Sequence, residues 1–190
     1  PGWFLPARGS EPGEKRPVVI VVNGYDGTLP ENYFGLGKAA TERGYHAVLF
    51  DGPGQGALLV NEGIPMNPEW GEVTSAVIDA NIDRGDVDSG RIALHGWSLG
   101  GYLAPRGAVG EPRVAAVVAD PALWGIIDGM RGLVAAMGSE ELAAGLPDDA
   151  VTLLEAGTEL GGAALVNAGL VVGPVDGYRH RLPLEPPAAI

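Results

Sequence analysis

The sequence predicts one three-layer α/β domain in which helices cover both faces of a mostly parallel sheet. Short apolar runs rich in β-branched residues alternate with helical segments, and glycine-rich loops follow several of these runs. This alternation is typical of parallel strands joined by crossover helices. The chain has 190 residues, of which 46% are hydrophobic, so it is long enough for one core and too short to favour two domains.

The predicted strands are rich in apolar residues, as is typical of strands buried on both faces of a sheet. They are residues 17–22, 46–50, 91–95 and 114–119, and residues 2–7 also resemble a strand. Two helices are predicted between them: residues 31–43, which Gly44 ends, and residues 69–83, whose apolar residues recur at helical spacing. A third helix begins near Ser98, and residues 51–68 predict a loop rich in proline and glycine.

The C-terminal part is less regular. We assign residues 1–124 to the core of the fold, and residues 125–190 to a cap segment and an irregular or incomplete remainder of the same domain. Residues 123–137 predict a helix, and residues 165–172 are the only later candidate strand. Because the chain starts at Pro1, directly before a strand-like segment, we expect that upstream sequence has been lost and that the fold is truncated.

Composition narrows the classes of function. The 12 basic and 24 acidic residues give a net charge of -12, which repels phosphate backbones, so we expect no nucleic-acid partner. The absence of cysteine excludes disulfides and thiolate chemistry. No apolar run approaches the roughly 18 residues that span a bilayer, and no signal peptide is evident. We therefore expect a cytoplasmic protein with no membrane partner, and a homodimer stays open.

The strongest functional signal is the run Gly96-Trp97-Ser98-Leu99-Gly100, directly after the predicted strand 91–95. A serine nucleophile on a sharp strand-to-helix turn needs small residues two positions before and after it, and Gly96 and Gly100 meet this demand. Such a turn lifts the Ser98 hydroxyl above the carboxyl edge of the sheet, where the following helix N-terminus favours negative charge. The competing interpretation is a glycine-rich packing turn.

A second signal, Asn23-Gly24-Tyr25, follows the strand 17–22. Where a serine lies on such a turn, the loop after this strand supplies one oxyanion donor and the residue after the nucleophile supplies the other. This assigns the backbone N–H groups of Tyr25 and Leu99. Taken alone, the loop is equally well explained as an ordinary turn before a helix.

Three segments together resemble the α/β-hydrolases: residues 21–27, residues 51–56 and the serine run. Within this group they are similar to the esterase/dipeptidyl-peptidase-like branch that includes 2,6-dihydropseudooxynicotine hydrolase and fermentation-respiration switch proteins. Ala119-Asp120-Pro121 also fits that branch, and the resemblance covers residues 2–124. It implies a serine hydrolase, or a C–C bond hydrolase that uses the same serine, with no cofactor and no metal.

A rival interpretation concerns residues 52–57, which match the G-x-G-x-x-A pattern of a dinucleotide site after a strand. Pro53 opposes it by removing a backbone N–H, and Asp51 places a carboxylate where a pyrophosphate would lie. We also expect no regular helix after this loop, because Gly63 and Pro65 interrupt the pattern. Cofactor binding is therefore not predicted.

The general base and its orienting acid are the uncertain part of the site. In this fold the order along the chain is serine, acid, histidine, so His180 is the only candidate base. His46 and His95 precede the serine and are interpreted as sheet residues. Asp120 is the candidate acid, although in most members of the family the acid follows a later strand. His180 is equally well a surface residue, and Asp120 equally well a structural one.

Two hypotheses follow from these observations. The first is a serine hydrolase that acts on an ester, amide or activated C–C bond of a small apolar substrate. The second is a non-catalytic fragment or pseudo-hydrolase that binds a small ligand. We expect slow or undetectable turnover of short acyl esters by the 190-residue chain and clear turnover by a full-length parent.

Overall fold

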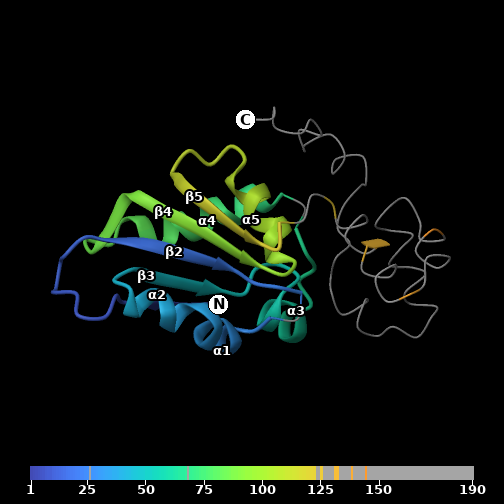
Figure 1. The fold of residues 1–190 in the computed structure, drawn as a ribbon, viewed down its shortest axis with the longest axis horizontal. Helices are drawn as coiled ribbons and strands as arrows, with labels where there is room; N and C mark the ends of the chain where they lie inside the picture. Colours follow the sequence, from blue (N-terminus) through green and yellow to red (C-terminus); the bar gives the residue numbers. More distant parts are fainter. Residues whose placement is uncertain are drawn as a thin grey trace.

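The structure, a computed structural model, describes residues 1–25, 27–67 and 69–122, together with positions 125, 131, 132, 138 and 144. This part of the chain contains a five-stranded sheet of order β1-β3-β2-β4-β5 (Figure 1). β1 runs antiparallel to β3, and all other neighbouring strands are parallel. The strands are β1 (Gly2–Leu5), β2 (Arg16–Val22), β3 (His46–Phe50), β4 (Val87–Trp97) and β5 (Val114–Asp120).

The four strands predicted from apolar runs are confirmed as the parallel neighbours β3, β2, β4 and β5. β4 begins earlier than predicted, at Val87, which pairs with Arg16 beyond a shift of register. Asp88, Ser89 and Gly90 are poor strand formers, so this extension depends on pairing with β2 and not on local propensity.

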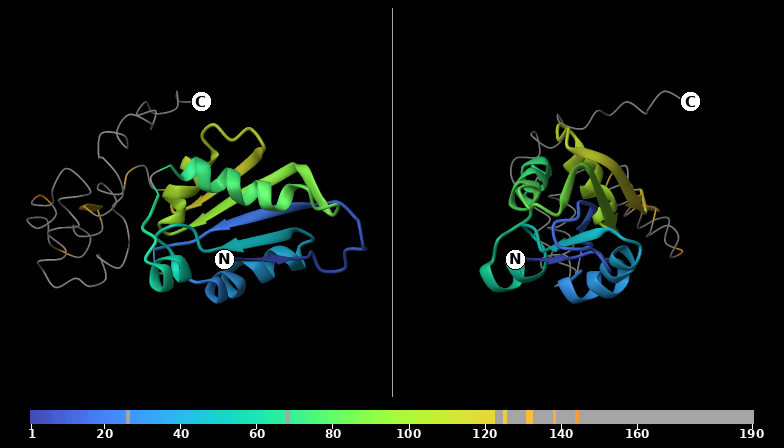
Figure 2. Two further views of the ribbon diagram at one scale, coloured as in Figure 1. Left: turned by 180° about the vertical axis from the view of Figure 1, so that it is seen from behind. Right: turned by 90° about the vertical axis from the view of Figure 1, so that its left-hand side faces the viewer.

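Helices cover both faces of the sheet, which confirms the predicted three-layer α/β architecture. α4 (Trp70–Ile82) and α5 (Gly100–Ala108) lie on one face, and α1 (Leu29–Asn32), η1 (Tyr33–Gly37) and α2 (Lys38–Glu42) on the other (Figure 2). The last three form one continuous helical stretch that widens to a π-helix at η1, and Gly44 follows it at φ 84°. No helix in the described residues has the length and apolar character needed to cross a bilayer.

The prediction of a loop at residues 56–62 is wrong, because these residues form the short helix α3 (Gly56–Glu62). Gly63 adopts the left-handed conformation at φ 65° and ends this helix. The glycine that interrupts the sequence pattern therefore marks the end of a helix.

Alternate residues of β2 face the two helical layers. Ile20 and Val22 pack in a cluster with α4 and α5, whereas Val21 packs with residues of α1 and α2. Trp70 on α4 is the largest buried side chain among the described residues and is 1% exposed. Burying a large apolar side chain stabilises a fold by about 1.5–3 kcal/mol, so Trp70 helps to hold α4 against the sheet.

A buried carboxylate anchors the connection between α5 and β5. Glu111 is 5% exposed and accepts hydrogen bonds from Ser75 Oγ at 2.6 Å and from Arg113 Nε at 2.7 Å. Arg113 also donates to Asp79 on α4. The hydrogen bonds from Arg113, followed by the one from Ser75, lower the pKa of Glu111 from 4.5 to about 2 against the opposing effect of burial.

Replacing Glu111 with glutamine is expected to lower the free energy of unfolding at pH 7 by about 1–3 kcal/mol, because Arg113 loses the buried one of its two charged partners. The pKa of this carboxyl is depressed in the folded state, so its contribution is complete above pH 4.5 and is lost as the pH falls towards about 2. Urea denaturation should therefore show a smaller difference at pH 3 than at pH 7. The exposed Glu62→Gln variant is the control, and an equal Glu111 effect at both pH values would contradict the prediction.

Candidate active site

Ser98 lies at the turn where β4 ends and α5 begins, as the sequence predicts. Its φ angle is 57°, and it is the only non-glycine residue with a positive φ in the described part of the chain. The left-handed conformation costs a residue that carries a Cβ about 1–2 kcal/mol. Such strain persists only where the surrounding structure imposes it, and it is concentrated at functional sites.

Close backbone contacts on both sides of Ser98 impose this turn. A side chain at Gly96 would overlap the carbonyl oxygen of Gly100, and one at Gly100 would overlap carbonyl oxygens at the end of β2. A side chain at Gly101 would overlap the carbonyl oxygen of Pro121. The glycines two positions before and after Ser98 are therefore required by packing.

Hydrogen bonds hold the strained residue from both directions. The Ser98 N–H donates to the carbonyl oxygen of Asp120 at 2.7 Å, and the Gly101 N–H donates to the Ser98 carbonyl oxygen at 2.8 Å. Ser98 itself is exposed. The end of β5 and the first turn of α5 thus present an accessible serine in a fixed backbone conformation.

The loop after β2 runs beside Ser98. A Cβ placed on Gly24 would stand 3.2 Å from Ser98 Cβ and 3.7 Å from its Oγ. β2 leads to β3 on one side and β4 leads to β5 on the other, so the chain leaves the ends of the neighbouring strands β2 and β4 in opposite directions. Ligands bind at such divergence points in open α/β sheets. Tyr25 and Leu99 both belong to these loops, and the direction of their N–H groups stays a prediction.

Asp120 ends β5 in register with Trp97, and its exposed side chain lies next to the serine turn in sequence and in pairing. Burial lowers the pKa of His95, against the opposing effect of the Asp120 charge. His95 is therefore neutral at pH 7, and its Nδ1 has no hydrogen-bond partner among the described residues. The main chain of Asp120 contacts the serine turn through its carbonyl oxygen. Its function as the catalytic acid stays a prediction.

Of the two other histidines, the structure describes His46 and does not describe His180. His46 is fully buried in β3, where its Nδ1 accepts from the Ala7 N–H at 2.8 Å and its Nε2 donates to the Asp86 carbonyl at 3.0 Å. Both ring nitrogens are thus used to tie the sheet to its flanking loops. His180 lies outside the described residues, as does the segment 125–190 that includes the predicted cap, apart from five positions.

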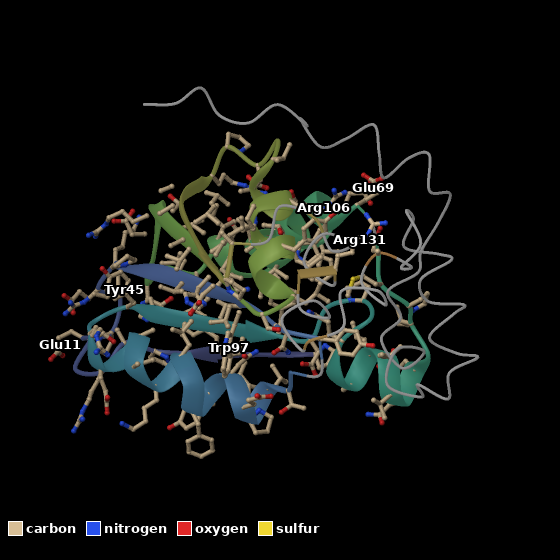
Figure 3. All side chains as sticks on the ribbon, turned by 45° about the vertical axis from the view of Figure 1, so that its right-hand side comes forward. Glu11, Tyr45, Glu69, Trp97, Arg106 and Arg131 are labelled. Atoms are coloured by element: carbon tan, nitrogen blue, oxygen red, sulfur yellow. The ribbon has the colours of Figure 1, made fainter. Side chains whose placement is uncertain are left out.

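Trp97, labelled in Figure 3, supplies an apolar surface directly before Ser98. It is 40% exposed, and its indole packs against Gly35 of η1, where an added Cβ would stand 3.0 Å from the ring. Phe34 on the same helix is 75% exposed. The sequence analysis missed this contact, because Trp97 occupies the variable position of the serine motif and Gly35 lies on a distant helix.

The family model of the α/β-hydrolase family matches residues 19–188. The chain belongs to this family. It is 40% identical over 136 residues to the α/β-hydrolase ucsC of Acremonium sp, which covers 67% of this chain and 27% of that protein. It is 40% identical over 119 residues to the 20-hydroxy-prefusarin hydrolase FUS2 of Gibberella moniliformis, which covers 60% of this chain and 28% of that protein. The chain thus spans less than a third of the length of these curated relatives.

Solved structures agree with this α/β-hydrolase assignment. The 2,6-dihydroxy-pseudo-oxynicotine hydrolase is 31% identical with a TM-score of 0.55, over 62% of this chain and 32% of that one. Est1E from Butyrivibrio proteoclasticus, solved with bound ferulic acid, has a TM-score of 0.55 at 18% identity over 70% of this chain and 52% of that one, and so supports the fold alone. The resemblance predicted from the sequence is confirmed.

The loop after β3 in this α/β-hydrolase is occupied by the protein's own groups. Asp51 Oδ2 accepts the Ala57 N–H at 3.0 Å, so a carboxylate already lies at the N-terminus of α3. The Asp51 carboxylate therefore occupies the place at which a pyrophosphate would meet the N-terminus of this helix.

The sequence analysis also missed a set of buried polar side chains beneath the loop after β2. They are Asn23, Asn32, Asp51 and Gln55. Polar groups seldom lie in a core unless they are hydrogen-bonded. Two of the four belong to the Asp51–Gly56 motif, but each also bonds to the loop after β2, so the motif alone does not reveal these contacts.

Proposed function

We propose that the α/β-hydrolase acts through Ser98 as nucleophile on an ester, amide or activated C–C bond of a small apolar substrate. The observation that carries this proposal is the strained conformation of an exposed serine at φ 57°, between β4 and α5 and against the loop that follows β2. A serine held in this way presents its hydroxyl for attack with little loss of conformational freedom.

The chemistry proceeds in two steps. Ser98 Oγ attacks the substrate carbonyl carbon while its proton passes to a general base, for which His180 is the candidate and Asp120 its orienting acid. The backbone N–H groups of Tyr25 and Leu99 donate to the oxygen that becomes negative, and the N-terminus of α5 adds a favourable dipole. The leaving group takes the proton, and water then hydrolyses the acyl-enzyme by the same route.

Apolar surface around Ser98 supports a small apolar substrate. Trp97 directly precedes the serine, is 40% exposed and packs against Gly35 of η1. Two similar proteins are named as hydrolases of 20-hydroxy-prefusarin and of 2,6-dihydroxy-pseudo-oxynicotine. From these names we infer only a substrate class for this chain, a low-molecular-weight organic compound.

A serine-reactive fluorophosphonate is expected to label Ser98 in the full-length parent protein, because attack on phosphorus uses the same hydroxyl and oxyanion donors. Mass spectrometry of the labelled peptide identifies the modified residue.

Turnover of short p-nitrophenyl esters should accompany labelling and should be lost in the His180→Ala variant. A protein that folds but neither labels nor hydrolyses would instead support the alternative, a non-catalytic domain that binds a small ligand. Brisk hydrolysis by a His180→Ala variant would exclude His180 as the base.

A further inference from the structure

Four polar side chains form a buried network beneath the loop that carries Tyr25. Asn23 and Gln55 are fully buried, Asn32 is 1% exposed and Asp51 is 5% exposed. They come from the ends of β2 and β3, from α1 and from the residue that precedes α3. Burying so many polar groups in one place opposes folding unless each is hydrogen-bonded, so their arrangement needs a physical reason.

The Asn23 side chain is held on both sides. The amide nitrogen of Asn32 donates to Asn23 Oδ1, and Asn23 Nδ2 donates to Asp51 Oδ1 at 3.0 Å. The second oxygen of Asp51 accepts the Ala57 N–H at 3.0 Å. These bonds fix the first residue of the loop relative to α1 and α3.

Gln55 acts on the main chain of the same loop. Its Nε2 donates to the carbonyl oxygen of Asn23 at 2.9 Å and to that of Gly24 at 3.3 Å. Its Oε1 accepts the Gly52 N–H at 3.3 Å, which sets the orientation of the side-chain amide. Gln55 thus spans from the loop after β3 to the loop after β2.

The second of these carbonyls matters for chemistry. The Gly24 carbonyl and the Tyr25 N–H belong to one planar trans peptide, so they point in opposite directions. A donor that fixes the Gly24 oxygen therefore also fixes the direction of the Tyr25 N–H. A hydrogen bond to the carbonyl further polarises the peptide and strengthens the N–H as a donor. Gly24 itself lies against Ser98, where an added Cβ would stand 3.2 Å from the serine Cβ.

We propose that Gln55 is a positioning residue that aims the Tyr25 N–H for oxyanion stabilisation through its hydrogen bond to the Gly24 carbonyl. This inference rests on the proposed function of Ser98 and Tyr25. The Asn32–Asn23–Asp51 chain provides the fixed support from which Gln55 acts. Because the oxyanion develops only in the transition state, Gln55 contributes to kcat and little to substrate binding.

Two variants of the full-length parent protein test this inference, with short p-nitrophenyl esters as substrates. Gln55→Met keeps the length of the side chain and removes both donated hydrogen bonds, and kcat should fall about 10- to 100-fold with KM changed by less than about threefold. Gln55→Glu places a carboxylate against the Asn23 and Gly24 carbonyls. Its kcat relative to that of the unmodified protein should be low at pH 8 and should recover as the pH falls and the carboxyl becomes a donor.

Asn81→Asp is the matched control, because Asn81 Nδ2 also donates to a backbone carbonyl, that of Val77, at 2.8 Å on α4. Its kcat should be unchanged, and its rate relative to the unmodified protein should not depend on pH. Thermal unfolding of every variant separates loss of fold from loss of rate.

The outcomes separate this inference from the proposed function. If hydrolysis depends on Ser98 but both folded Gln55 variants keep the kcat of the unmodified protein, or change KM alone, the inference is overturned and the proposed function stands. If both variants fail to fold, Gln55 has a structural function and the inference is again overturned. If the unmodified protein does not hydrolyse through Ser98, the proposed function fails and the inference fails with it.

Discussion

Replacing Ser98 with alanine is expected to lower kcat for a short acyl ester by about 10⁴-fold or more, because the covalent route is lost while the oxyanion donors remain. The residual rate should be that of water attacking a bound, polarised ester. Steady-state kinetics with p-nitrophenyl butyrate measures the change, and intact-protein mass spectrometry should show that the fluorophosphonate adduct is absent.

The control for this experiment is Ser89→Ala. Ser89 is an exposed serine near the start of strand β4, whereas Ser98 directly follows the end of that strand. The Ser89→Ala variant should keep full activity and should still form a single fluorophosphonate adduct. If Ser98→Ala retains the kcat of the unmodified protein, Ser98 is not the nucleophile and the strained turn needs another explanation.

Replacing Gly100 with alanine is expected to cause a large loss of folding stability. A Cβ at Gly100 would overlap the carbonyl oxygens of Val22 and Asn23, which are main-chain atoms of the central strand and its loop. These atoms cannot move without shifting β2 relative to α5, so we expect a loss of about 3 kcal/mol or more, or failure to fold. Urea denaturation and the yield of folded protein give the measurement.

Gly71→Ala is the matched variant on a helix of the same layer. A Cβ there meets only the Val109 carbonyl oxygen at 3.6 Å, an ordinary contact. Alanine is a better helix former than glycine, so this variant should gain up to about 1 kcal/mol. If Gly100→Ala and Gly71→Ala have the same stability, the packing explanation of the serine turn is wrong.

The parts of the fold that the sequence predicts are those in which local chemistry determines the structure. The run from Pro17 to Val22 can bury both faces only in the middle of a sheet, and Gly96 and Gly100 flank a serine at the one spacing that such a turn requires. Their positions follow from short stretches of sequence. The parallel strands and the serine turn could be predicted from the sequence for this reason.

The parts that the sequence does not reveal depend on contacts between distant segments. Gln55 lies in a motif that resembles a phosphate loop, yet its side chain bonds to main-chain atoms of Asn23 and Gly24. No local pattern distinguishes these alternatives, because glycine-rich loops serve both. The helix α3 was missed for a related reason, since Gly63 both interrupts the periodicity and ends the helix.

The conformation of Ser98 has a consequence for how this sequence would change over evolutionary time. Glycine adopts a φ of 57° without the penalty that a Cβ incurs, so a glycine at position 98 would make the fold more stable by about 1 kcal/mol. A lineage that needed only a folded ligand-binding domain would gain from that substitution and lose nothing. If Ser98 is the nucleophile, as proposed, selection for hydrolysis would keep a serine at this position against the gain in stability that a glycine offers.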